Sequence, residues 1–67
     1  MREQIEQIFK GSTVVNSKDE YSCAVYYKYM AWYISHEQDG YSAHNVRQDK
    51  RITAKTLVAL KTKMDLL

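Results

Sequence analysis

The chain has 67 residues, a net charge of +2, a single cysteine and no proline. A chain of this length forms one domain, residues 1–67, and buries only about 60% of the surface that it exposes when unfolded, so we expect marginal stability. The lone Cys23 excludes an internal disulfide and fits a reducing compartment, which predicts a cytoplasmic protein. The start of the chain lacks the pattern of a signal peptide, and its longest weakly charged run is too short to span a membrane.

An amphipathic helix is predicted over residues 2–10. Ile5, Ile8 and Phe9 recur at helical spacing, and Gly11 follows as a stop signal. Two to three helical turns are not stable alone in water, so the apolar side of this helix must be buried on another element. Residues 12–15 then predict a short strand, and residues 16–20 predict a turn.

Residues 21–34 fit either a strand or a helix. A helix is favoured by Ser17 and Glu20, which have the spacing of a capping box. A strand is favoured by the many Tyr, Val, Trp and Ile residues in the segment. The polar run 36–40 ends in Asp-Gly and has β-favouring residues on both sides, which is typical of a five-residue hairpin loop. This loop favours the strand.

A single strand over 21–34 would exceed the usual length of about 5–6 residues, so we expect a bend near Lys28. In a simple hairpin register Trp32 lies opposite His44 and Tyr33 lies opposite Ala43. One face of the strand would be wholly apolar, formed by Cys23, Val25, Tyr27, Tyr29, Ala31 and Tyr33.

A second helix is predicted from an N-cap at Thr53 to the C-terminus. Its apolar residues fall in one sector at about 100° per residue: Leu57, Leu60, Met64 and Leu67. The fold class predicted from these elements is α+β, a small two-layer domain with an N-terminal helix, an antiparallel β-hairpin or three-stranded sheet, and a C-terminal helix. The alternative is an all-α domain of three or four helices.

Several kinds of chemistry are excluded or disfavoured. Two glycines cannot form a glycine-rich phosphate loop. One Cys and two His cannot complete a tetrahedral zinc site without carboxylates. His36, Glu37, Asp39 and His44 would lie near the predicted turn, but such residues are the ordinary composition of turns. We therefore predict no catalytic residues, no cofactor and no metal.

The positive charge is concentrated in the second part of the chain. Residues 1–40 carry four basic and six acidic groups, whereas residues 41–67 carry six basic and two acidic groups. Nucleic-acid binding through the basic segment 47–63 is therefore the alternative function. A helix-turn-helix motif fits this segment poorly, because charged residues occupy positions where small or apolar residues are usual. The candidate phosphate-binding residues are Arg47, Lys50, Arg51, Lys55 and Lys63.

The leading hypothesis is a small non-enzymatic regulatory or adaptor protein that binds another protein, of the size of a bacterial or phage modulator. Six tyrosines and one tryptophan are a large aromatic content for 67 residues. Aromatic side chains dominate the energetics of protein interfaces. The predicted protein-binding residues are Tyr26, Tyr29, Trp32, Tyr33 and Tyr41. A homodimer is compatible with either function, because a marginal core is stabilised by association.

Overall fold

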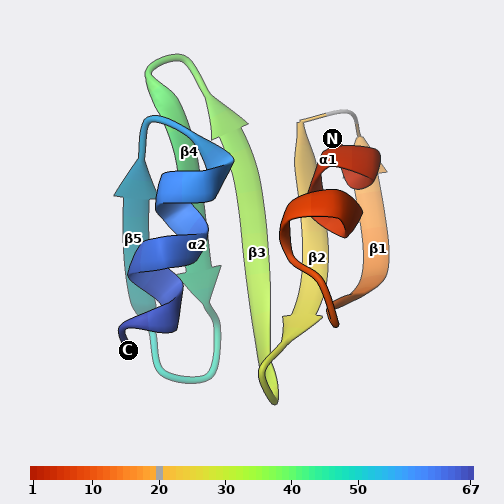
Figure 1. The fold of residues 1–67 in the computed structure, drawn as a ribbon, viewed down its shortest axis with the longest axis vertical. Coiled ribbons are helices and arrows are strands. Elements are labelled where there is room, and N and C mark those ends of the chain that lie inside the picture. Colours follow the sequence, from red (N-terminus) through yellow and green to blue (C-terminus); the bar gives the residue numbers. More distant parts are fainter. Residues whose placement is uncertain (20) are drawn as a thin grey trace.

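A five-stranded antiparallel sheet forms the centre of the protein in its computed structural model (Figure 1). The backbone is described over residues 1–19 and 21–67, and the side chains over residues 1–15 and 21–67. Each strand pairs with the next along the chain, so the sheet is a meander in the order β1-β2-β3-β4-β5. The elements are α1 (Arg2–Ile8), β1 (Thr13–Asp19), β2 (Ser22–Tyr27), β3 (Met30–Glu37), β4 (Gly40–Asn45), β5 (Lys50–Ala54) and α2 (Leu57–Asp65).

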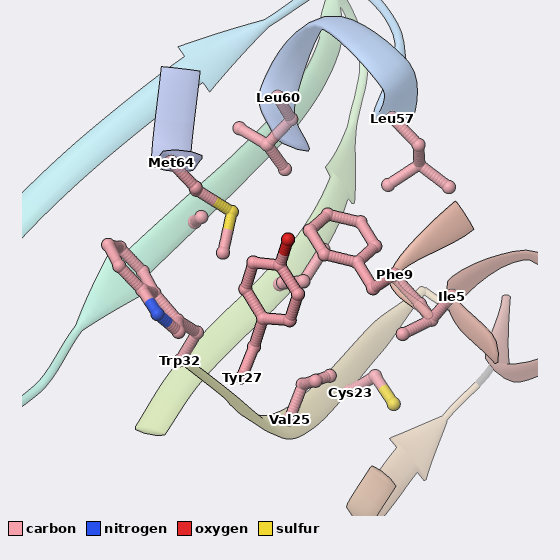
Figure 2. Packing of buried hydrophobic residues seen from close by; sticks show 11 residues of the cluster. Ile5, Phe9, Cys23, Val25, Tyr27, Trp32, Leu57, Leu60 and Met64 are labelled. Atoms are coloured by element: carbon pink, nitrogen blue, oxygen red, sulfur yellow. The ribbon is translucent and has the colours of Figure 1, made fainter. Parts of the chain in front are cut away.

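Both helices cover the same face of the sheet. In Figure 1 they lie in front of the strands, α1 by β1 and β2 and α2 by β4 and β5, and the two helices also contact each other. Figure 2 shows side chains from both helices and from the strands pointing into one shared interior. The Phe9 ring meets the Tyr27 ring edge-on, with 5.2 Å between the centroids. The buried residues are Ile5, Phe9, Cys23, Val25, Tyr27, Trp32, Ile34, Ala43, Leu57, Leu60 and Met64.

The predicted fold class is wrong in the number of strands in the sheet. The prediction was a hairpin or a three-stranded sheet, whereas the structure has five strands between the two helices. The all-α alternative is also wrong, because residues 22–27 and 30–37 are strands. The chain is α+β.

The segment 21–34 is two strands and not one bent strand. Lys28 and Tyr29 form the turn between β2 and β3, both with positive φ, as in a type I′ hairpin turn. In β2 the odd-numbered side chains face the helices, and after the two-residue turn the even-numbered side chains of β3 do so. Val25 therefore pairs with Trp32, and both are buried. The wholly apolar face predicted for a continuous strand is therefore wrong: Tyr29 is the most exposed aromatic residue of the described chain.

The second hairpin is also tighter than predicted. Glu37 pairs with Gly40, so only Gln38 and Asp39 lie between the strands in place of a five-residue loop. As a result the register shifts by one residue: Tyr33 lies opposite His44, and not opposite Ala43. Trp32 accordingly lies opposite Asn45 and not opposite His44.

The two helices are shorter than predicted. Thr53 is not an N-cap, because it lies in β5, where it pairs with Ser42. The N-cap is Thr56, whose side chain accepts a hydrogen bond from the Ala59 backbone N–H. Helix α1 ends at Ile8 rather than residue 10.

The turn predicted at residues 16–20 is replaced by strand as far as Asp19, since β1 is longer than the predicted segment 12–15. Asn16 pairs with Ala24, with shifts of register on both sides. The predicted capping box involves the side chain of Ser17 and the whole of Glu20, which lie outside the described residues.

Asp65 joins the end of α2 to the first hairpin. Its carboxylate accepts a hydrogen bond from the Tyr27 hydroxyl at 2.7 Å and forms ion pairs with Lys28 and Lys61, both at 2.9 Å. These three donors, that of Lys28 first, lower the pKa of Asp65 below its usual value of 3.8. Burial and the hydrogen bond to Asp65 raise the pKa of Tyr27.

We expect Asp65→Asn to destabilise the protein by about 1–2 kcal/mol at neutral pH, because it removes the charge that pairs with Lys28 and Lys61. The loss is no larger because the side chain is partly exposed and water screens these ion pairs. The pKa of Asp65 is lower in the folded state, so this contribution is complete above the unfolded pKa and decreases as the pH falls below it. Urea unfolding between pH 7 and pH 2 measures both effects. The matched control is Asp49→Asn, whose carboxylate is 93% exposed beside His44 and should change stability little. Equal losses in the two variants would contradict the assigned role of Asp65.

Candidate protein-binding face

The face of the sheet opposite the helices carries two tyrosines and two alanines on β2 and β3. In the strand register Ala24 pairs with Tyr33, and Tyr26 pairs with Ala31. Each pair therefore joins one large and one small side chain, and the large one changes strand from one pair to the next. We call Ala24, Tyr26, Ala31 and Tyr33, with the flanking Val15 and Val46, the tyrosine face.

Three large apolar or aromatic side chains are exposed on this face. Tyr26 is 47% exposed, Val15 is 68% exposed and Val46 is 58% exposed. Val15 and Val46 contribute to one shallow hollow of about 110 Å³ together with Ala24, Ala31 and Tyr33. Contiguous apolar patches of this kind on small proteins are typical of interaction sites.

A second hollow adjoins the first at the end of the sheet where β2 turns into β3. It measures about 440 Å³, and Ala31 lines both hollows. Its walls bring two exposed tyrosines, Tyr26 and Tyr29, together with the guanidinium-bearing Arg47. Asn45, buried at its base, donates to the Met30 sulfur at 3.1 Å and accepts from the Gln48 backbone N–H at 3.0 Å. We call this hollow the tip hollow.

The other half of the same face, over β3, β4 and β5, is polar. The Ser42 hydroxyl donates to a Glu37 carboxylate oxygen at 2.6 Å, and Arg51 approaches the same oxygen at 3.8 Å. Ser42 is consequently buried although it lies on the face without helices. His44 lies 3.2 Å from the exposed Asp49 carboxylate. The charges on this half are therefore partly neutralised by one another.

The five aromatic residues predicted to bind a protein are divided by the sheet. Tyr26 and Tyr33 lie together on the tyrosine face, and Tyr29, 91% exposed, lies beside them in the turn. Trp32 lies on the helix-covered side and is 3% exposed. Tyr41 is half-buried on that same side and stacks on the His36 ring, with 4.4 Å between the centroids.

The predicted phosphate-binding residues do not gather on one surface. Arg47 lines the tip hollow, and Lys50 begins β5 nearby. Arg51 is directed toward Glu37. Lys55 and Lys63 lie at the opposite end of β5, where the Lys63 ammonium group donates to the Thr53 carbonyl oxygen at 2.7 Å.

A third, open hollow of about 750 Å³ lies between the β3–β4 turn and the end of β5, with Lys63 of α2 at its side. Lys55 and Lys63 line it, but so do Glu37 and Asp39, so its charges are mixed. Gly40 also lines it, at the point where the chain crosses close to Ala54. This hollow lacks the concentration of one charge that would select an ionic ligand.

Groups that carry chemistry are dispersed over the described residues. Burial raises the pKa of the Cys23 thiol, which disfavours its reactive thiolate form. In the part of the chain that the structure describes, no three His, Cys, Asp or Glu side chains are grouped to hold a metal ion. Neither helix of that part has the length and apolar character needed to cross a membrane.

The sequence reasoning missed Val15, Ala24, Ala31 and Val46 as components of a site. Small and aliphatic side chains give no chemical signal of their own. The sequence contains these Ala and Tyr residues at regular spacing, but only the β2–β3 register shows that they pair across the two strands on one face. Comparisons with protein-family models, curated proteins and solved structures found no match to this chain.

Proposed function

We propose that this chain is a small non-enzymatic regulatory or adaptor protein that binds another protein through the tyrosine face and the tip hollow. The observation that carries this proposal is the placement of Tyr26, Tyr29 and Arg47 around one hollow, at the end of the sheet that adjoins the uncovered face. Tyr and Arg are enriched among the residues that dominate binding energy at protein interfaces. The reduced thiol of Cys23 supports a cytoplasmic site of action.

The tyrosine face has the composition of the centre of an interface. Its paired residues are Ala24 with Tyr33 and Tyr26 with Ala31, so the central surface carries no charge that binding would have to desolvate. Arg47 lies at its border, where a charged side chain remains in contact with water and favours an acidic group on the partner. A partner segment with an apolar side chain next to a carboxylate fits this arrangement.

Binding to nucleic acid has less support. Phosphate recognition requires basic groups along one path, and the five basic residues are divided between the two ends of β5. Arg51 is directed toward a carboxylate and Lys63 toward a backbone carbonyl. Nucleic-acid binding is therefore an outcome that the experiment must be able to detect.

The proposal is tested by recovering partners of the tagged full chain from a lysate of its source, with and without nuclease. We expect a discrete protein that survives nuclease treatment and is lost with Ala31→Arg, which places a charged side chain between the two hollows. The matched control is Val58→Arg, at a 60% exposed position on α2. It should recover the same protein as the unmodified chain.

Two results would overturn the proposal. In the first, Ala31→Arg and Val58→Arg recover the same proteins as the unmodified chain. In the second, recovery depends on nucleic acid and is weakened by charge reversal at Lys50, Arg51 and Lys55, with a steep dependence on salt. Circular dichroism of each variant must show the unmodified spectrum, so that a loss of binding is not a loss of folding.

A further inference from the structure

The tyrosine face has a pattern that is complementary to itself. Ala24 and Tyr33 form one cross-strand pair, and Tyr26 and Ala31 form the next pair on the same face. The two tyrosines stand on one diagonal of this square and the two alanines stand on the other. The two large tyrosine side chains therefore form two knobs, and the two small alanines leave two holes beside them.

A two-fold rotation about an axis that lies above this square and parallel to β2 and β3 exchanges the two strands. A second copy placed by that rotation sets its Tyr33 over Ala24 and its Tyr26 over Ala31. Every knob then enters a hole, and each contact occurs twice, as in an isologous interface. The same rotation brings Val15 of β1 over the β4 side of the second copy, where the exposed Val46 lies.

The edges of the sheet are less suited to self-association. The β5 edge carries Lys50 and Arg51, and Lys63 already donates to a carbonyl oxygen of this strand. The β1 edge is interrupted by register shifts between Val14 and Asn16 and again before Asp19. Charged residues and bulges are the usual protection of edge strands against pairing with another chain. The uncovered face is thus the surface left for a second copy.

We propose that the tyrosine face binds a second copy of this chain, forming a two-fold symmetric dimer in which two sheets pack face to face with β2 and β3 at the centre. This inference rests on the proposed function, because it assigns an occupant to the same surface. The second copy and the partner protein bind the same surface and therefore exclude each other. The partner must displace the second copy in order to bind.

The dimer is weak and exchanges readily. A stable interface takes about 800 Å² of surface from each partner. The accessible surface of the whole molecule is 4754 Å², and the tyrosine face is part of one side of it, so the interface is small. The central contacts are apolar and carry no unpaired charge, which favours association despite the small area. We therefore expect a dissociation constant in the range of about 10 µM to about 1 mM.

Sedimentation equilibrium of the purified full chain, from micromolar to millimolar concentration, measures this association. The apparent mass should rise with concentration from that of the monomer, 7.9 kDa, toward twice that value. Two variants should remain monomeric over the whole range: Ala31→Arg, which fills a hole, and Tyr26→Ala, which removes a knob. The control Val58→Arg on α2 should associate as the unmodified chain does.

A chain that is monomeric at every concentration would overturn the dimer but not the proposed function, which recovery of a partner that depends on Ala31 tests independently. Association that persists in both Ala31→Arg and Tyr26→Ala would also overturn it, because the interface would lie elsewhere. Conversely, the chain could form a dimer that both Ala31→Arg and Tyr26→Ala abolish while no partner protein is recovered. That result would support the dimer and contradict the proposed function.

Discussion

Trp32→Ala should remove most of the protein's free energy of unfolding at 25 °C. Trp32 is 3% exposed and lies in the interior that both helices cover (Figure 2). Truncation of a buried tryptophan or phenylalanine to alanine costs about 3–5 kcal/mol, since it removes apolar contacts and leaves a cavity. Small domains have a total stability of about 5–15 kcal/mol, and a chain of this size is at the lower end. Urea unfolding followed by circular dichroism measures the loss.

The control is Tyr26→Ala on the other side of the sheet. Tyr26 is 47% exposed, so its removal should cost less than about 1 kcal/mol. The two variants compare a core residue with a residue of the proposed binding face within one hairpin. If Trp32→Ala were as stable as Tyr26→Ala and weakened a complex instead, the two faces of the sheet would be assigned the wrong way round.

Gly40→Ala should be the most damaging substitution after Trp32→Ala. A Cβ atom at Gly40 would lie 2.4 Å from the Ala54 carbonyl oxygen and 2.9 Å from the Lys55 Cα, both backbone atoms that cannot move aside easily. The φ of +147° at Gly40 adds strain for any residue with a side chain. We expect a loss of about 2–4 kcal/mol from these two effects together.

Gly11 provides the matched comparison for this prediction. Its φ is +83°, but no atom lies within 4 Å of an added Cβ. Gly11→Ala should therefore cost only the backbone strain of about 1–2 kcal/mol. Thermal unfolding of the two variants side by side isolates the effect of the close approach. Equal losses would show that β5 does not cross Gly40 as tightly as described.

The sequence predicted the two helices and the strand character of the middle better than the number of strands. Asp39-Gly40 is a recognisable turn signal, and it located the second hairpin. The first hairpin turns at Lys28-Tyr29, two residues that rarely adopt positive φ, so no local signal marked it. The ion pair of Lys28 with Asp65 contributes to holding that turn, and it depends on a residue 37 positions away.

The candidate site was predicted only in part for the same reason. Tyr26, Tyr29 and Tyr33 are on or beside the uncovered face, as an aromatic interface requires. Trp32 falls on the opposite side, because a two-residue turn reverses the alternation that a continuous strand would have kept. A shift of one residue in register decides whether an aromatic side chain is core or surface, and composition alone does not contain that information.

We propose that the tyrosine face is a binding surface for protein. The most direct test replaces Ala31 by a photo-crosslinking phenylalanine analogue in the full chain, expressed in its source cells, with the same replacement at Val58 as the control. Irradiation should join position 31 to a partner protein or to a second copy of the chain, and position 58 should give neither product. Crosslinks to protein from position 58 but not from position 31, or to nucleic acid alone, would contradict the claim.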